Sequence, residues 1–280
     1  MKHLLKLSDL TPEEITGILN LADQLKYEKK NGIKHHYLKG KALGMIFQKS
    51  STRTRVSFEV GMLDLGGHAL FLSNRDLQIG RGEPIEDTAR VLSRYLDGIM
   101  IRTFDQAEVE ALAEYGTIPI INGLTDYAHP CQVLADLMTI REYKKSLEGL
   151  KLCFIGDGNN MANSLIVGCI KMGMEVSVAC PAGYRPDAAL TAWAEKNGKF
   201  TCTEDVMLAV RDADAVYTLS LIHISRWFCR LQKKKNQRSL YKYKCLCAQR
   251  PRGTGQHPFS GRCRLRCRRR RCFPLPRFSF

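Results

Sequence analysis

The stretch ALGMIFQKSSTRTRVSFEVGM, residues 42–62, joins an apolar run to a helical pattern through a turn rich in hydroxyl and arginine side chains. Residues 42–47 are typical of a buried strand, and a helix that begins just after such a strand offers unpaired N–H groups and the positive end of its dipole. Ser51, Thr52, Arg53 and Thr54 stand at that point. Hydroxyls, amides and a guanidinium suit a tetrahedral dianion, which favours a phosphate site; an ordinary helix cap is the alternative.

The same alternation of apolar runs and helical patterns continues along the chain. A helix is predicted after Thr11, where Pro12 and Glu14 complete a capping box. Strand-like runs, separated by helical segments, predict an α/β fold of two doubly wound parallel-sheet domains. The predicted strands cover residues 42–47, 69–72, 98–101, 118–121, 152–155, 176–179 and 215–217. The polar stretch 144–149 marks the expected boundary between a domain of residues 1–145 and a second domain from residue 146.

The charge of the chain is concentrated at one end. The 280 residues include 43 Lys and Arg against 28 Asp and Glu, a net charge of +15. Residues 219–280 hold 18 of the basic residues, six of the eleven cysteines and no acidic residue, so the first 218 residues are slightly acidic. No apolar run approaches the length of a membrane helix, and the opening residues lack the apolar core of a secretory signal. We therefore expect a cytoplasmic protein with reduced cysteines.

Three further stretches place polar groups near the expected phosphate site. Arg102 ends a strand in MIRTF, although a single arginine there is often a surface residue. In HPCQ, His129 stands at a helix N-cap and Pro130 at N1, so that His129 and Gln132 face the same crevice; a purely structural cap is the alternative. The polar stretch 73–90 has the length of a lid, or of a plain surface loop.

The stretch KLCFIGDGNNMANSL, residues 151–165, follows a strand with two glycines. A dinucleotide site is disfavoured because Met161 takes the third glycine position and the next strand ends in Cys180 and Pro181 without an acid for a ribose. The amides of Asn159, Asn160 and Asn163 suit a small polar substrate, while caps and turns are the alternative use of asparagine.

SSTRTR, MIRTF, HPCQ and GDGNN, in this order and spacing, resemble ornithine carbamoyltransferase over residues 1–218. SSTRTR is shared with the aspartate enzyme of the same superfamily, whereas HPCQ and GDGNN favour the ornithine branch. The resemblance implies transfer of a carbamoyl group from carbamoyl phosphate to ornithine in arginine metabolism. It also implies a homotrimer with sites at subunit interfaces and no metal or organic cofactor.

The resemblance assigns a role to each candidate residue. Arg102 and His129 are the expected catalytic residues: Arg53, Arg102 and the helix amides would neutralise the departing phosphate, and His129 with a threonine hydroxyl would donate to the carbonyl oxygen. Ornithine would contact Asn160. Carbamoyl phosphate would be bound by Ser51, Thr52, Arg53, Thr54, Gln78, Arg102, His129 and Gln132.

The resemblance ends at Thr218, within a strand, which leaves the second domain incomplete. The family's later ornithine motifs are missing, so we expect little or no transfer activity and cannot distinguish ornithine from putrescine or another amine as acceptor. Residues 219–280 have the basic, cysteine-rich composition of a chimeric or frameshifted reading frame. The alternative is a nucleic-acid-binding protein acting through this tail; otherwise we expect only non-specific binding of nucleic acid there.

Overall fold

The computed structural model describes residues 2–218, and the predictions for residues 219–280 lie outside this range. The chain opens with η1 (Leu7–Asp9) and α1 (Pro12–Lys30). The elements around the first sheet are β1 (Ala42–Phe47), α2 (Thr52–Asp64), β2 (His68–Ser73), η2 (Gln78–Arg81), α3 (Ile85–Leu92), β3 (Gly98–Arg102), α4 (Gln106–Tyr115) and β4 (Ile120–Leu124). The elements that follow are α5 (Pro130–Lys144), β5 (Lys151–Ile155), α6 (Asn160–Lys171), β6 (Glu175–Ala179), η3 (Ala182–Tyr184), α7 (Ala188–Asn197), β7 (Phe200–Thr203), α8 (Val206–Ala209) and β8 (Ala215–Thr218).

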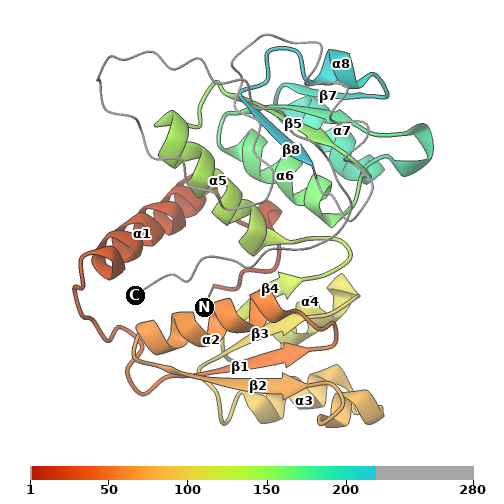
Figure 1. The fold of residues 1–280 in the computed structure, drawn as a ribbon. Helices are drawn as coiled ribbons and strands as arrows, with labels where there is room; N and C mark the ends of the chain where they lie inside the picture. Colours follow the sequence, from red (N-terminus) through yellow and green to blue (C-terminus); the bar gives the residue numbers. More distant parts are fainter. Residues whose placement is uncertain (1, 219–280) are drawn as a thin grey trace, which may run out of the picture. The chain divides into compact units, whose positions relative to one another are not determined.

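Two four-stranded parallel sheets form the described part of the protein, which confirms the predicted fold class (Figure 1). Their strand orders are β2-β1-β3-β4 and β7-β6-β5-β8. In both sheets the first strand of the chain lies in the middle, so its carboxyl end is flanked by the ends of its neighbours. Ligands of open α/β sheets bind at such an edge.

The first sheet is covered by helices on both faces, because successive side chains of its strands point to opposite faces and nearly all of them are apolar. Met45 and Phe47 pack with Met62 of α2 on one face, whereas Ile46 and Ile99 pack with the helices of the other face. Figure 1 shows α2 and α3 on opposite sides of this sheet. A strand that is buried on both faces reads as a continuous apolar run, and for this reason residues 42–47 are recognisable in the sequence.

The second sheet follows the same rule. Leu152 and Phe154 face the larger core, while Cys153 faces a small cluster with Ala209 of α8. The larger core also contains apolar residues of η1, α1 and α5, among them Leu19 and Leu137. The segments that precede the first sheet and follow it therefore pack beside the second sheet.

The helix starts agree with the sequence analysis. Thr11 and Glu14 form the predicted capping box of α1, with Pro12 at its first position. His129 is the N-cap of α5 and Pro130 its first residue. Local capping chemistry thus fixes where these helices begin.

Two strands differ from the prediction. β4 occupies Ile120–Leu124 rather than residues 118–121, because its pairing with β3 runs from Ile120 beside Ile99 to Leu124 beside Arg102. β7 (Phe200–Thr203) was not predicted, since this short edge strand alternates apolar and polar residues and is only partly buried.

Candidate functional site

The N-terminus of α2 lies at the carboxyl end of β1. Ser51 has an extended backbone, and its Oγ accepts a hydrogen bond from the Thr54 N–H at 3.3 Å. The same hydroxyl donates to Thr54 Oγ1 at 3.0 Å, which fixes both side chains at the helix end. Thr52 and Arg53 are exposed on the first turn. Two ordered hydroxyls therefore stand beside the positive end of the helix dipole.

Arg102 ends β3 directly beside Phe47 of β1. Its Nη1 donates to Thr54 Oγ1 at 3.4 Å, whereas its buried Nε has no hydrogen-bond partner among residues 2–218. Burial, together with the nearby charge of Arg53, lowers the pKa of the Arg102 guanidinium. An arginine remains charged at neutral pH even so. A desolvated cation next to a second cation is the setting that an anion would stabilise.

The loops after β1, β3 and β4 are joined at this edge. The Gln48 N–H donates to the Arg102 carbonyl at 2.9 Å, and the Asp126 N–H donates to the Phe104 carbonyl at 2.9 Å. Lys49 pairs with Asp126 and lies 4.1 Å from the centre of the Phe104 ring. The sequence analysis missed this pair: a lysine beside SSTRTR was visible, but its partner 77 positions away was not.

His129 is held through its backbone. Its N–H donates to Ser164 Oγ at 2.8 Å, and the preceding Ala128 N–H donates to Thr125 Oγ1 at 3.0 Å. The imidazole makes no capping hydrogen bond to α5. Gln132, one turn later, donates to Asp136 Oδ1 at 2.9 Å. Both predicted residues thus belong to the loop and helix that follow β4.

Gln78 begins η2 in the segment between β2 and α3, and its side chain is exposed. Among the described residues its side chain forms no hydrogen bond with the other predicted site residues. The helix α3 starts at Ile85, so residues 74–84 separate it from β2, and their role as a lid stays a prediction.

Asn160 joins α6 to the loop after β4, because its Nδ2 donates to the Thr125 carbonyl at 2.6 Å. Asn159 caps α6, and Asn163 donates to the Tyr127 carbonyl at 3.2 Å. Two of these amides, those of Asn160 and Asn163, therefore hold the loop after β4 against α6. A glycine is required at position 158, because a Cβ there would lie 2.1 Å from the backbone nitrogen of Pro186.

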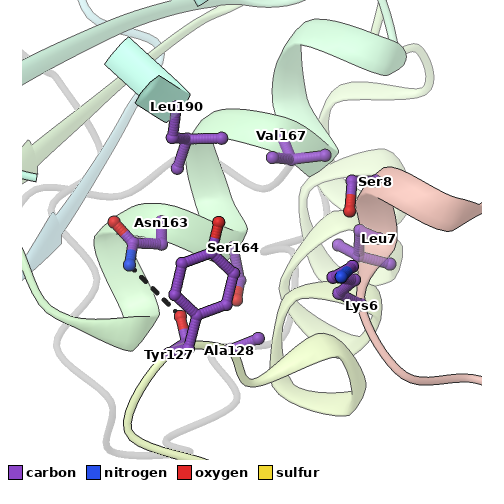
Figure 2. Close-up of a pocket in the computed structure, with 9 residues that line it drawn as sticks. All are labelled: Lys6, Leu7, Ser8, Tyr127, Ala128, Asn163, Ser164, Val167 and Leu190. Carbon is purple, nitrogen blue, oxygen red and sulfur yellow. Dashed lines mark hydrogen bonds between the residues drawn. The ribbon is translucent and has the colours of Figure 1, made fainter. Parts of the chain in front are cut away.

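A small cavity of about 30 Å³ lies beside the contact of α6 with the loop after β4 (Figure 2). It holds little more than one water molecule, so it is too small for either expected substrate. Burial raises the pKa of the Tyr127 phenol that lines it, and the charge of Asp187 adds to this rise. The lining residues are Lys6, Leu7, Ser8, Tyr127, Ala128, Asn163, Ser164, Val167 and Leu190.

The described part of the chain contains no helix long and apolar enough to cross a membrane. Within the same residues, no three His, Cys, Asp or Glu side chains are grouped as metal ligands.

The structure thus connects four predicted residues directly: Ser51 and Thr54 to each other, Arg102 to Thr54, and the Arg53 charge to Arg102. His129 and Gln132 follow β4, whose end lies next to that of β3. Asn160 reaches this region through Thr125, while Gln78 stands apart on η2. The connected group can hold a dianion with guanidinium, hydroxyl and amide donors.

Two family models match the chain. Residues 2–142 match the model described as aspartate/ornithine carbamoyltransferase, carbamoyl-P binding domain. Residues 148–247 match the model described as aspartate/ornithine carbamoyltransferase, Asp/Orn binding domain, and that match ends beyond the last described residue.

Curated relatives and solved structures agree with the family models. The ornithine carbamoyltransferase of Pelobacter propionicus is 56% identical over 219 residues, which cover 78% of this chain and 72% of the relative. That of Anoxybacillus flavithermus is 58% identical over 222 residues, covering 78% and 71%. The ornithine carbamoyltransferase structure from Pyrococcus furiosus matches with a TM-score of 0.76 and 51% identity over 83% of this chain and 76% of that one. The Burkholderia thailandensis structure matches with a TM-score of 0.79 and 39% identity over 89% and 87%.

Proposed function

Because the chain belongs to the aspartate/ornithine carbamoyltransferase family, we propose that it binds carbamoyl phosphate at the α2 N-terminus and serves carbamoyl transfer to ornithine. The observation that carries this proposal is the state of Arg102. Its guanidinium is partly desolvated, lies near the Arg53 charge and has an unpaired Nε among the described residues. A phosphate dianion would supply the missing negative charge.

The reaction requires the amine of ornithine to attack the carbamoyl carbon. Charge then builds on the carbonyl oxygen, and phosphate leaves as citrulline forms. Arg53, Arg102 and the first-turn amides of α2 would neutralise the phosphate, while Thr54 and His129 would donate to the carbonyl oxygen. One such donor typically lowers the activation barrier by about 3 kcal/mol.

Thr52, Gln78 and Gln132 complete the proposed carbamoyl phosphate site. Asn160 would contact ornithine. Its side chain donates to the Thr125 carbonyl, which belongs to the loop that leads to His129, and this contact supports the role. Putrescine or another amine remains the alternative acceptor, since the family motifs expected to select the acceptor are missing from this sequence. A biosynthetic role in arginine metabolism and a cytoplasmic location remain predictions.

A homotrimer is part of the proposal. The outer face of α2 and the adjacent edge strand β2 expose large apolar side chains, with Leu63 73% exposed and Val56, Val60, Leu70 and Phe71 also exposed. Such a patch is typical of a protein–protein interface. Light scattering of the purified chain would test this part separately from ligand binding.

Calorimetric titration with carbamoyl phosphate tests the proposed site. We expect Arg53→Ala to weaken binding at least about tenfold, because one charge-assisted hydrogen bond contributes roughly 1.5–3 kcal/mol. Arg55→Ala is the matched control, since Arg55 pairs with Glu59 on the same helix. Equal heats for the Arg53 variant and the unmodified chain would refute the site. Transfer of the carbamoyl group is a separate assay, because we expect it to be weak in this chain.

A further inference from the structure

Two cysteines on neighbouring strands lie in contact. Cys180 follows β6, and Cys202 lies in the edge strand β7. Val178 is the register partner of Cys202, so Cys180, two residues after Val178, points to the same face of the sheet. The two sulfur atoms are 3.7 Å apart. A covalent bond between them needs an approach to about 2.05 Å. Because the two residues are offset by two register positions, this approach needs a shift of the backbone at Cys180, which lies just beyond β6, as well as side-chain rotation.

The backbone on both strands is already fixed by hydrogen bonds. The Cys180 N–H donates to the Thr203 carbonyl at 3.1 Å, and the Ala179 carbonyl accepts from the Gly156 N–H at 3.1 Å. The Cys180–Thr203 hydrogen bond thus holds the ends of β6 and β7 side by side. Cys131 differs, because its thiol donates to the Asn122 carbonyl at 3.4 Å.

The two thiols differ in exposure. Cys180 is 4% exposed, while Cys202 is only partly buried. Burial raises the pKa of the Cys180 thiol to about 11, and the adjacent Cys202 adds to this effect. Cys202 is consequently the thiol that an oxidant reaches first, and Cys180 is placed to react second.

We propose that Cys180 and Cys202 are a reversible dithiol–disulfide pair that exchanges with small-molecule disulfides and joins the edge strand β7 to β6. The Cys202 thiolate attacks one sulfur of the small disulfide, forming a mixed disulfide and releasing one thiolate. The Cys180 thiolate then attacks Cys202 Sγ and releases the second. The two protons lost by the cysteines pass to the two released thiolates, and the two electrons reduce the small disulfide.

The bond would act on an edge that is otherwise held on one side only. β7 has a single neighbour, β6, in the described sheet. Joining the strands closes the chain segment between residues 180 and 202, which restricts the unfolded state. We expect the oxidised chain to melt about 5–10 °C higher than the reduced chain.

Peptide mapping of the full chain tests this pairing. The reduced protein is equilibrated with mixtures of oxidised and reduced glutathione, blocked with N-ethylmaleimide and digested with trypsin without reduction. Trypsin spares the Arg185–Pro186 bond, so Cys180 lies in peptide 172–196 and Cys202 in peptide 200–211. We expect these two peptides to become linked as the oxidised share rises and to separate again with dithiothreitol.

Variants and a denatured control make the test decisive. Cys202→Ser and Cys202→Ala should both abolish the linked species and the rise in melting temperature, whereas Cys169→Ser should leave both unchanged. In concentrated guanidinium chloride the eleven cysteines should pair without this preference. The proposal is overturned if the folded chain links Cys180 or Cys202 mainly to other cysteines, or if neither reacts while others do.

Discussion

Replacing Arg102 by methionine should separate ligand binding from stability. The methionine keeps the apolar stem that packs at the end of β3 but removes the guanidinium. That group is half-buried, its Nε lacks a partner among residues 2–218, and its hydrogen bond to Thr54 Oγ1 is long, at 3.4 Å. The charge of Arg53 opposes it further.

The magnitudes follow from these contacts. Most arginine truncations at a packed position lower stability, but here the removed charge is unfavourably placed, so we expect the free energy of unfolding to stay equal or rise by about 1 kcal/mol. For a chain of this size the melting temperature would rise by about 0–4 °C. Binding of carbamoyl phosphate should weaken by at least about 2 kcal/mol, or roughly 30-fold, because charge-assisted hydrogen bonds are lost.

Differential scanning calorimetry with and without carbamoyl phosphate measures both effects. Arg55→Met is the matched control: Arg55 lies 3.8 Å from the Phe71 ring and pairs with Glu59, so its loss should lower stability and leave the ligand-induced shift intact. The reasoning is refuted if Arg102→Met lowers the melting temperature as Arg55→Met does, or if it retains the full ligand-induced shift.

Three further substitutions test the scaffold by thermal or urea unfolding. Asp214→Asn should cost about 1 kcal/mol at pH 7, because the Lys144 hydrogen bond lowers the pKa of this carboxyl in the folded state. That stability is fully present above the unfolded pKa, so the difference from the unmodified chain should shrink as the pH falls below about 4 and vanish only below the lowered folded pKa; a pH-independent difference would contradict it. Ser51→Ala should cost about 1 kcal/mol through the lost cap of α2, and an unchanged urea midpoint would contradict this. Gly158→Ala should lower the free energy of unfolding by more than about 2 kcal/mol, since the added Cβ would meet the backbone near Pro186. Gly183→Ala is the control because a Cβ there has open space, and equal effects of the two substitutions would contradict this reasoning.

The architecture could be predicted where burial of a strand on both faces produces a continuous apolar run in the sequence. The inner strands β1, β3 and β5 are apolar on both faces, so residues such as Ile46 and Phe154 mark them in the sequence. β6 is recognisable from Val176 and Val178, although Ser177 is buried on its other face. β7 was not predicted because an edge strand packs on fewer neighbours and tolerates polar residues such as Thr201 and Thr203. The shift of β4 depends on its register with β3, which is irregular between Ile101 and Arg102, and no local pattern can indicate that register.

The candidate site was predictable to the same extent. Strand ends and helix starts are local features, so Ser51, Arg102 and His129 could be placed at the correct boundaries. Their partners could not. The contact of Lys49 with Asp126 and that of Asn160 with Thr125 depend on which loops meet after folding.

The two sheets use one construction with different chemistry at its carboxyl edge. Asp97 accepts from the Ala42 N–H at the start of β1, and Asp214 accepts from the Lys151 N–H at the start of β5. Because these two hydrogen bonds are equivalent, β3 corresponds to β8, and Ile101 beside Ile46 corresponds to Thr218 beside Ile155. The counterpart of Arg102 is residue 219, which lies outside the described residues. The first edge carries a desolvated cation at Arg102, whereas the described strand β8 carries no charged side chain. Within the described residues an anion is therefore better accommodated by the first sheet, which is the physical reason to test carbamoyl phosphate binding independently of the acceptor.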